Sequence, residues 1–342
     1  MIIAIVASIL GFGLLIFFHE LGHFIMAKKI GVKVEKFSLG YGPELLGFTK
    51  GETRYLISAF PLGGYVKVAG ENSQPGRGER WELNSRSPGE RMLVYFFGPL
   101  FNFILASLLF TVVFIIGVPT FDFQSTVIGR VTDGYPAQEA GLMAGDEIKT
   151  INGEKVRSWI EVQERVRRES NRPITIRVLR QGKEIEFQIL PKWDEEIKTK
   201  IIGISPQEVI KKFSIFESIK EGFVQTGVLT CAILKGLFLI VFGKAKLDVA
   251  GPIGIFQMLG MQAQQGMSSL LYFIGFISVN LAILNLFPIP ILDGGVILLL
   301  VIEAIRHKPI PERGRQILEQ IGLVLLIGLM IFATFKDMLR IR

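Results

Sequence analysis

The sequence predicts an α-helical polytopic membrane protein, with about four transmembrane helices, that carries an additional β-rich domain. Hydrophobic residues make up 49% of its 342 residues, which is more than ordinary soluble domains contain. Four long apolar segments are separated by one highly charged loop and by one stretch of alternating, strand-like pattern. We expect four parts, at 1–118, 119–195, 196–269 and 270–342.

The four segments expected to span the membrane lie at about 2–27, 92–118, 270–292 and 317–336. The first has no charged residue from Met1 to Phe18 and no basic start or small-residue cleavage site, so we expect it to be retained rather than removed as a signal peptide. The single cysteine, Cys231, excludes an internal disulfide and is expected to be a small buried residue.

A fifth apolar stretch, at 222–242, is interrupted by Lys235 after thirteen uncharged residues. So short a run is more often interfacial or re-entrant than spanning. We therefore expect this stretch to be membrane-associated without crossing.

Charge predicts the orientation of the chain. The loop from Lys28 to Arg91 contains eleven Lys and Arg against seven Glu, which places it in the cytosol by the positive-inside rule. The N-terminus and residues 119–216 would then lie outside, and the third span would run parallel to the first. The net charge of +7 is explained by cytosolic flanks near anionic lipid and by a basic outer domain, so no nucleic-acid partner is expected.

The pentapeptide His-Glu-Leu-Gly-His lies at the end of the first apolar segment. A helix places His19 and His23 on one face about 6 Å apart, so both can bind one metal ion with Glu20 beside it. On a soluble helix such a motif is often chance. Ionisable residues at membrane depth are costly, however, and two of the three histidines of the chain are here, which favours a metal site.

Asp293 is the candidate third ligand. It is the only one of seven aspartates within an apolar run, in NLFPIPILDGG, and at such depth a carboxylate needs a cation. The alternative is a helix cap with a glycine turn. Pro288 and Pro290 should break the helix just before it. Asn285, Pro288 and Asn102 are candidate substrate contacts, although the two asparagines could equally be helix-packing amides.

The stretch from Thr126 onward predicts a small β-rich module of about seventy residues, with a hairpin turn at Asn152-Gly153. Its GLxxGDxIxxING pattern resembles PDZ domains, which bind an extended chain end by strand addition. Val127, Ile128 and Gly129, at the start of the strand 127–131, would then form the accepting groove. A steric cap that binds nothing is the alternative.

HELGH, GPLFN (98–102) and NLFPIPILDGG together resemble the site-2 proteases, intramembrane zinc metalloproteases of M50 type, and specifically those with an outer PDZ-like domain. FSLGYGP (37–43), PLGGYVKVAGE (61–71) and AGPIGI (250–255) extend the resemblance over nearly the whole chain. The resemblance implies Zn²⁺ on His19, His23 and Asp293, with Glu20 as general base. The chain departs from the family pattern at two points. Val296 stands where relatives often have histidine, and only one PDZ-like module is present where some relatives have two.

The family implies cleavage of single-span membrane proteins in the bilayer of the bacterial cytoplasmic membrane, with an anti-sigma factor or signal-peptide remnants as substrates. It also implies a membrane-re-entrant β element in the cytosolic loop. Gly64, Tyr65 and Val66, in the short strand predicted at 62–68, would pair with the unwound substrate, or would form an ordinary surface hairpin.

Three other functions fit the sequence less well. A metal transporter would need neither Glu20 nor a peptide-binding module, and a catalytically dead scaffold would tend to have lost a ligand. A soluble-type peptidase with a membrane anchor would keep HExxH outside the apolar run.

Overall fold

The chain forms two compact units in the computed structural model, which describes residues 2–71, 78–168, 172–195, 198–244 and 250–341. Unit 1 combines Met1–Ile116 with Phe213–Arg342, and unit 2 is Gly117–Lys212. The predicted boundary of the outer module at residue 195 is therefore wrong, because the compact unit continues through residues expected to form a linker.

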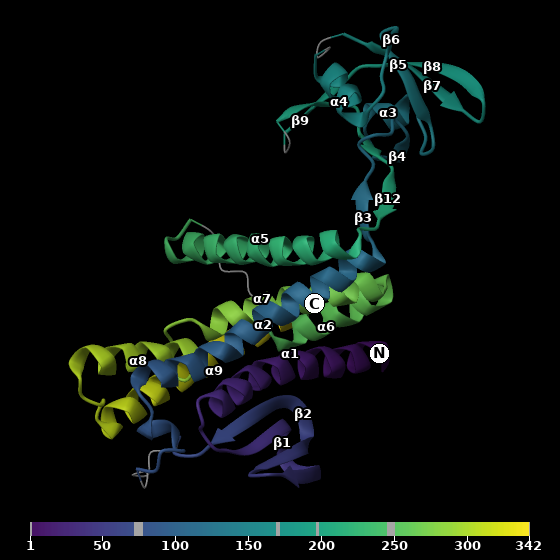
Figure 1. Cartoon of the computed structure of the whole chain (residues 1–342). Helices are drawn as coiled ribbons and strands as arrows, with labels where there is room; N and C mark the ends of the chain where they lie inside the picture. The colour runs from purple at the N-terminus through teal and green to yellow at the C-terminus, as the bar shows by residue number, and fades with distance from the viewer. Residues whose placement is uncertain (1, 72–77, 169–171, 196–197, 245–249, 342) are drawn as a thin grey trace. The chain divides into compact units, whose positions relative to one another are not determined.

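Unit 1 contains the long apolar helices (Figure 1). Within the described residues, five helices are long and apolar enough to cross a membrane, and four of them coincide with the predicted spans. The helices of unit 1 are α1 (Ile2–Lys29), α2 (Pro88–Ile116), α5 (Ile215–Val241), α6 (Pro252–Gln265), α7 (Met267–Asn285), α8 (Asp293–Arg306) and α9 (Glu312–Ile341).

The fifth long helix is α5, and it differs from the prediction in length. Lys235 does not interrupt it, and the helix runs for 27 residues from a Ser214 capping box. Its interfacial position therefore cannot be argued from a short run. Cys231, on this helix, is exposed, which contradicts the expected burial.

Helix α2 is the centre of unit 1 and packs against α1, α5, α7 and α8. One buried cluster joins Leu15, Leu105, Leu259 and Ile274, and a second surrounds Phe110. Small and polar residues allow close contacts, as between Ser107 and Thr226, whose hydroxyl oxygens are 3.0 Å apart. Such close packing is typical of membrane helices, where apolar surface alone gives no preference for protein over lipid.

Strands β1 (Val34–Lys50) and β2 (Thr53–Val68) lie beside α1 (Figure 1). Both strands bend, so that 36–39 pairs with 54–57 on one side and 34–39 pairs with 64–68 on the other. The predicted strand at 62–68 is thus the end of β2 and an edge of this sheet. No other strand among the described residues pairs with Gly64, Tyr65 and Val66 on their free side.

The predicted helix break before Asp293 is confirmed. Helix α7 ends at Asn285, residues 286–292 form a non-helical segment with Pro288 and Pro290, and Asp293 begins α8. A proline lacks a backbone donor, which explains why the helix does not continue here.

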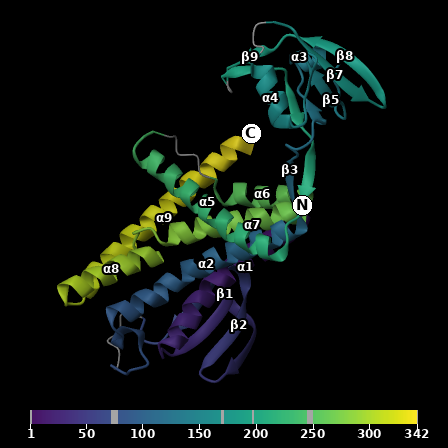
Figure 2. The same ribbon diagram turned by 45° about the horizontal axis from the view of Figure 1, so that its top comes forward.

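Unit 2 is built around a four-stranded sheet in the order β6-β5-β7-β8, with α4 (Trp159–Arg168) packed beside it (Figure 2). Trp159, Val162 and Val166 of α4 are buried against Ile174 and Ile176 of the sheet. The predicted turn at Asn152-Gly153 is confirmed, with φ of 52° and 81°. The sheet strands are β5 (Glu147–Ile151), β6 (Glu154–Lys155), β7 (Ile174–Arg180) and β8 (Lys183–Ile189).

Short strand pairs complete unit 2. Strand β3 (Val118–Phe121) pairs with β12 (Glu208–Lys211), and β9 (Lys192–Asp194) pairs with β10 (Thr199–Ile201). The β3–β12 pair therefore joins the first and last residues of the unit. A short helix, α3, covers Pro136–Glu139.

The predicted peptide-accepting strand is not a free edge. Strand β4 (Ile128–Val131) pairs with β11 (Ile204–Pro206) on one side. On its other side, Ile128 N–H donates to Asp146 (2.8 Å) and Ile128 C=O accepts from Gly145 (2.7 Å). Ile128 is also fully buried. The assignment of Val127, Ile128 and Gly129 to a binding groove was therefore wrong, because neighbouring backbone already occupies both edges.

Candidate metal centre

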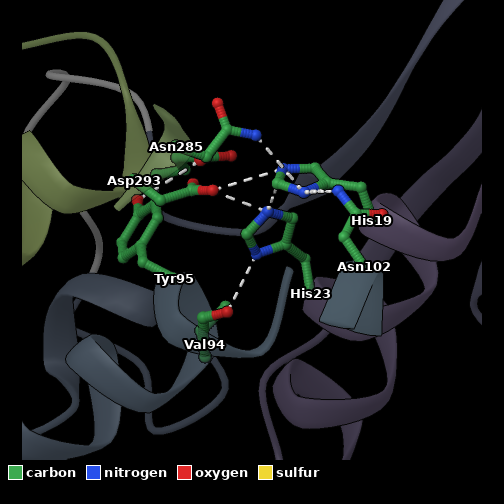
Figure 3. A network of polar contacts seen from close by, with 8 residues as sticks. His19, His23, Val94, Tyr95, Asn102, Asn285 and Asp293 are labelled. Atoms are coloured by element: carbon green, nitrogen blue, oxygen red, sulfur yellow. Dashed lines mark hydrogen bonds and ion pairs between the residues drawn. The ribbon is translucent and has the colours of Figure 1, made fainter. Parts of the chain in front are cut away.

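The two histidines of α1 and the aspartate of α8 converge on one point (Figure 3). The Nε2 atoms of His19 and His23 are 3.1 Å apart. Asp293 Oδ2 lies 3.2 Å from His19 Nε2, and Asp293 Oδ1 lies 3.5 Å from His23 Nε2. Residues 270 positions apart in the chain thus meet as the sequence predicts.

These three groups fit a zinc ion. With zinc–ligand bonds of about 2.0–2.1 Å, the edge of a coordination tetrahedron is about 3.3 Å, close to the separations found here. Asp293 Oδ2 is buried without a hydrogen-bond partner among the described residues, and two imidazole nitrogens face each other at 3.1 Å. A shared cation satisfies all of them. Three protein ligands would leave a fourth position open.

Contacts on the far side of each ring orient the histidines. His23 Nδ1 donates to the Val94 carbonyl at 2.8 Å, which leaves Nε2 with its lone pair toward the site. His19 Nδ1 lies 3.3 Å from the Asn102 amide and 3.5 Å from the Asn285 amide. Asn102 Oδ1 has no hydrogen-bond partner among the residues that the structure describes, so turning this amide by half a turn would let Oδ1 accept from His19 N–H. Asn102 is fully buried and therefore orients His19 rather than lining the cavity.

Two glycines permit this arrangement where α1 and α2 cross. A β-carbon on Gly98 would lie 2.3 Å from His23 Nε2 and 2.9 Å from His19 Cε1. A β-carbon on Gly22, the glycine of HELGH, would lie 2.1 Å from the carbonyl oxygen of Phe97. The backbones must therefore touch at this crossing, as small residues allow between membrane helices.

The metal site opens into a cavity of about 680 Å³. Glu20 lines it, and the Val66 N–H at the β2 edge hydrogen-bonds to the Glu20 carboxylate. Gly64 packs so close to α1 that a β-carbon on it would lie 3.3 Å from Glu20 Cγ. The cavity thus joins the three ligands, the candidate base and the edge strand 64–66. Asn285 and Pro288 are not among its lining residues.

Sequence reasoning missed several polar residues of this cavity. Glu71 and Tyr95 line it, and Tyr95 Oη donates to Glu71 Oε1 at 3.4 Å. Four residues at the beginning of α9 also line it: Arg315, Gln316, Glu319 and Gln320. The sequence pattern could have indicated these four residues, because they directly precede an apolar stretch and their spacing places them on one helix face.

Comparison with known proteins agrees with this geometry. The family model described as peptidase family M50 matches residues 7–329. The chain belongs to this family. A Clostridium acetobutylicum protein named as a zinc metalloprotease is 37% identical over 97% of this chain and 96% of its own length. The Bacillus subtilis protein named regulator of sigma-W protease RasP is 31% identical over 98% of each chain.

Among solved structures, the PDZ domain of the SdrC-like protein of Listeria monocytogenes matches 25% of this chain and 92% of its own, with 24% identity and a TM-score of 0.22. Family membership and the names of the full-length relatives show that the chain is a zinc metalloendopeptidase. With its apolar helices, it is a multi-pass membrane protein.

Proposed function

We propose that this M50 peptidase hydrolyses peptide bonds within the transmembrane segments of single-span membrane proteins. The observation that carries the proposal is the convergence of His19 and His23 of α1 with Asp293 of α8, beside a strand edge that pairs with no further strand in the part of the chain that the structure describes. Zinc held by these three residues would supply Lewis acidity toward water and the scissile carbonyl.

Glu20 is the proposed general base. Its carboxylate adjoins the ligand His19 in sequence and lines the same cavity. It takes a proton from the attacking water and returns that proton to the departing amine. Glu20 accepts a hydrogen bond from the Val66 N–H of β2 and lies close to His23 of α1. Its carboxylate is therefore positioned where the strand edge meets the metal ligands.

The strand edge at Gly64, Tyr65 and Val66 is the proposed substrate clamp. A transmembrane helix hides its peptide bonds in its own hydrogen bonds, so it must unwind before hydrolysis. Pairing with an exposed edge restores hydrogen bonds to the freed backbone, which is costly to leave unpaired in lipid. Asn285 ends α7 and Pro288 lies in the non-helical residues that lead to Asp293, and we propose that they contact substrate next to the ligand.

A relative is named for regulation of a sigma factor, which supports a membrane-bound anti-sigma factor as one substrate class; signal-peptide remnants are another. We place the β1–β2 sheet on the cytosolic side of the bacterial cytoplasmic membrane and unit 2 outside, because basic residues concentrate in the loop 28–91. Single cysteines at Gly51 and Gly182, both in open turns, test this orientation. Both cysteines are introduced into a variant that lacks Cys231. Labelling of the cysteine at position 182 from inside the cell would contradict the proposed orientation.

Two variants test the mechanism in lipid nanodiscs with a fluorogenic transmembrane substrate. Glu20→Gln should abolish turnover and retain one zinc per chain, since an amide cannot act as a base. Asp293→Ala should lose both turnover and tight zinc binding, since it removes a ligand. Glu35→Gln, a half-exposed carboxylate on β1 that pairs with Lys67 and does not line the cavity, serves as the control and should match the unmodified protein. Turnover by Glu20→Gln, or stoichiometric zinc in Asp293→Ala, would disprove the respective assignment.

A further inference from the structure

The beginning of α9 places a polar stripe on the wall of the catalytic cavity. We define the α9 stripe as Arg315, Gln316, Glu319 and Gln320, all of which line the cavity. Their spacing of one, three and four residues puts them on one helix face. They lie within a candidate membrane span, Arg313–Leu339. Polar side chains in such a span are energetically costly and are usually retained for a partner or a function.

A close backbone contact holds the α9 stripe beside the metal site. A β-carbon on Gly322 would lie 1.9 Å from the carbonyl oxygen of Pro290. Pro290 precedes the ligand Asp293 by three residues, and Gly322 follows Gln320 by two. The position of the stripe is therefore tied to the segment that delivers Asp293.

The stripe presents neutral hydrogen-bonding groups. Arg315 Nε donates to Glu319 Oε1 at 2.8 Å, so the two charges of the stripe offset one another within one helix turn. Gln316 and Gln320 each carry an amide that can both donate and accept, as a peptide bond does. Such a surface suits peptide groups and small polar side chains better than charged ones.

The spacing of the two amides matches an extended chain. Residues four apart on a helix are separated by about 6 Å along its axis. Residues two apart in a strand, which point in the same direction, repeat at about 6.6 Å. Gln316 and Gln320 can therefore contact two successive groups of one extended segment.

We infer that the α9 stripe binds the unwound substrate from a second wall of the cavity and sets which transmembrane segments are cleaved. Gln316 and Gln320 are the specificity-determining residues, and they favour segments with asparagine or serine beside the scissile bond. This inference rests on the proposed intramembrane cleavage. One face of the unwound segment pairs with Gly64–Val66, while its other polar groups meet the stripe.

The test compares two substrates that differ only by Leu or Asn on either side of the scissile bond. The full-length enzyme in nanodiscs should prefer the Asn substrate. Gln316→Leu/Gln320→Leu should raise KM for it about tenfold, as expected for two lost hydrogen bonds, and should remove the preference. We expect kcat to change less than about twofold and zinc content to be unchanged, which a merely structural defect would not give. Gln316→Asn/Gln320→Asn should restore part of the preference.

Arg313→Leu is the matched control, because Arg313 is exposed in the same turns of α9 but does not line the cavity. It should leave KM and preference unchanged. The inference is overturned if the double Leu variant ranks the substrates as the unmodified enzyme does, or if Arg313→Leu causes the same loss. Substrate binding to each variant in the Glu20→Gln background gives a readout without turnover. An unmodified enzyme that cleaves neither substrate, and whose Glu20→Gln form binds neither, would instead disprove the proposed function.

Discussion

The metal site depends on one residue that has no side chain. Gly98 lies where α2 crosses α1, directly against the two histidine rings. Its role is steric, because only a hydrogen fits between the α2 backbone and His23 Nε2. The ligands are therefore positioned by the helix crossing as much as by their own helix.

Gly98→Ala should displace the histidine rings and lower zinc affinity at least tenfold, comparable with the loss of an outer contact that orients a ligand. Zinc content after dialysis against a chelator of known affinity measures this. Gly13→Ala, at a membrane-embedded glycine with open space around it, is the control and should retain zinc. Stoichiometric zinc in Gly98→Ala under the same conditions would show that the crossing adapts without cost.

Single site residues could be predicted from the sequence where an ionisable side chain is energetically costly in its surroundings. His19, Glu20, His23 and Asp293 could be predicted because charges and imidazoles at membrane depth need a function. The role of Asn102 could not be predicted. Whether a buried amide meets substrate or a histidine depends on which face of α2 turns toward α1, and the contact joins residues 83 positions apart.

Among the elements, α6 depends on a carboxylate from another helix. Asp337 of α9 accepts from Gly251 N–H (3.0 Å) and Gly254 N–H (2.8 Å) at the beginning of α6. Gly251, the N-cap, has no side chain to do this, and the first amides of a helix otherwise lack partners. Asp337 is buried, so this contact explains an ionisable residue in an apolar helix and ties α9 to α6.

Asp337→Leu should leave two buried amides unpaired and destabilise unit 1 by about 2 kcal/mol or more. Thermal unfolding in nanodiscs, followed by hydrogen exchange of α6 amides, measures the loss. Asp337→Asn keeps one acceptor oxygen and should lose less. Thr334→Val removes an exposed hydroxyl from the same end of α9 and should have no effect. Unchanged exchange of α6 in Asp337→Leu would contradict the capping role.

In unit 2, Asp146 joins the β4–β5 region to β7. Its carboxylate accepts from Arg180 Nε (2.6 Å) and Nη2 (2.7 Å) and from Met143 N–H (2.9 Å). Burial opposes ionisation, but these donors outweigh it and lower the pKa of Asp146 below its ordinary value. A lowered folded-state pKa stabilises the fold above the unfolded pKa near about 4, and this stabilisation is lost as pH falls through the folded value.

Unit 2 should therefore become less stable below about pH 4. Arg180→Met should reduce its stability at neutral pH by about 2 kcal/mol, because the buried carboxylate loses its charged partner and keeps only the Met143 N–H. Hydrogen exchange of the β7 amides in the full-length protein, measured across pH, follows both effects. Arg177→Met on the same strand breaks only exposed pairs and should be close to neutral. Equal exchange in the Arg180→Met and Arg177→Met variants would show that the Asp146–Arg180 ion pair does not stabilise unit 2.

Whole-molecule organisation was only partly visible in the sequence. The helix-rich and β-rich parts follow from composition and periodicity, and four predicted spans coincide with helices. The boundary at 195 was wrong because β11 and β12 are short, and their partners β4 and β3 precede them by more than seventy residues. Pairing over such a distance leaves no local pattern, and for the same reason β4 was mistaken for a free edge.

We expect the two units to divide catalysis and substrate selection between them. All residues proposed for chemistry lie in unit 1, while unit 2 begins and ends in the paired strands β3 and β12. Replacing residues 122–207 by Asn-Gly would close these strands as a hairpin and keep the link to α2 and α5. This variant should retain zinc and cleave a short-tailed substrate at about the unmodified rate.

We expect the same variant to lose discrimination against a substrate that carries a folded outer domain, because we propose that unit 2, which contains none of the residues proposed for chemistry, acts as a filter against bulky outer domains. The ratio of kcat/KM for the two substrates, in unmodified and shortened enzyme, measures this. An unchanged ratio would show that unit 2 does not select substrates. Loss of cleavage of both substrates in a variant that still holds zinc would show instead that unit 2 is needed to complete the site, since a filter can only restrict a reaction that unit 1 performs by itself.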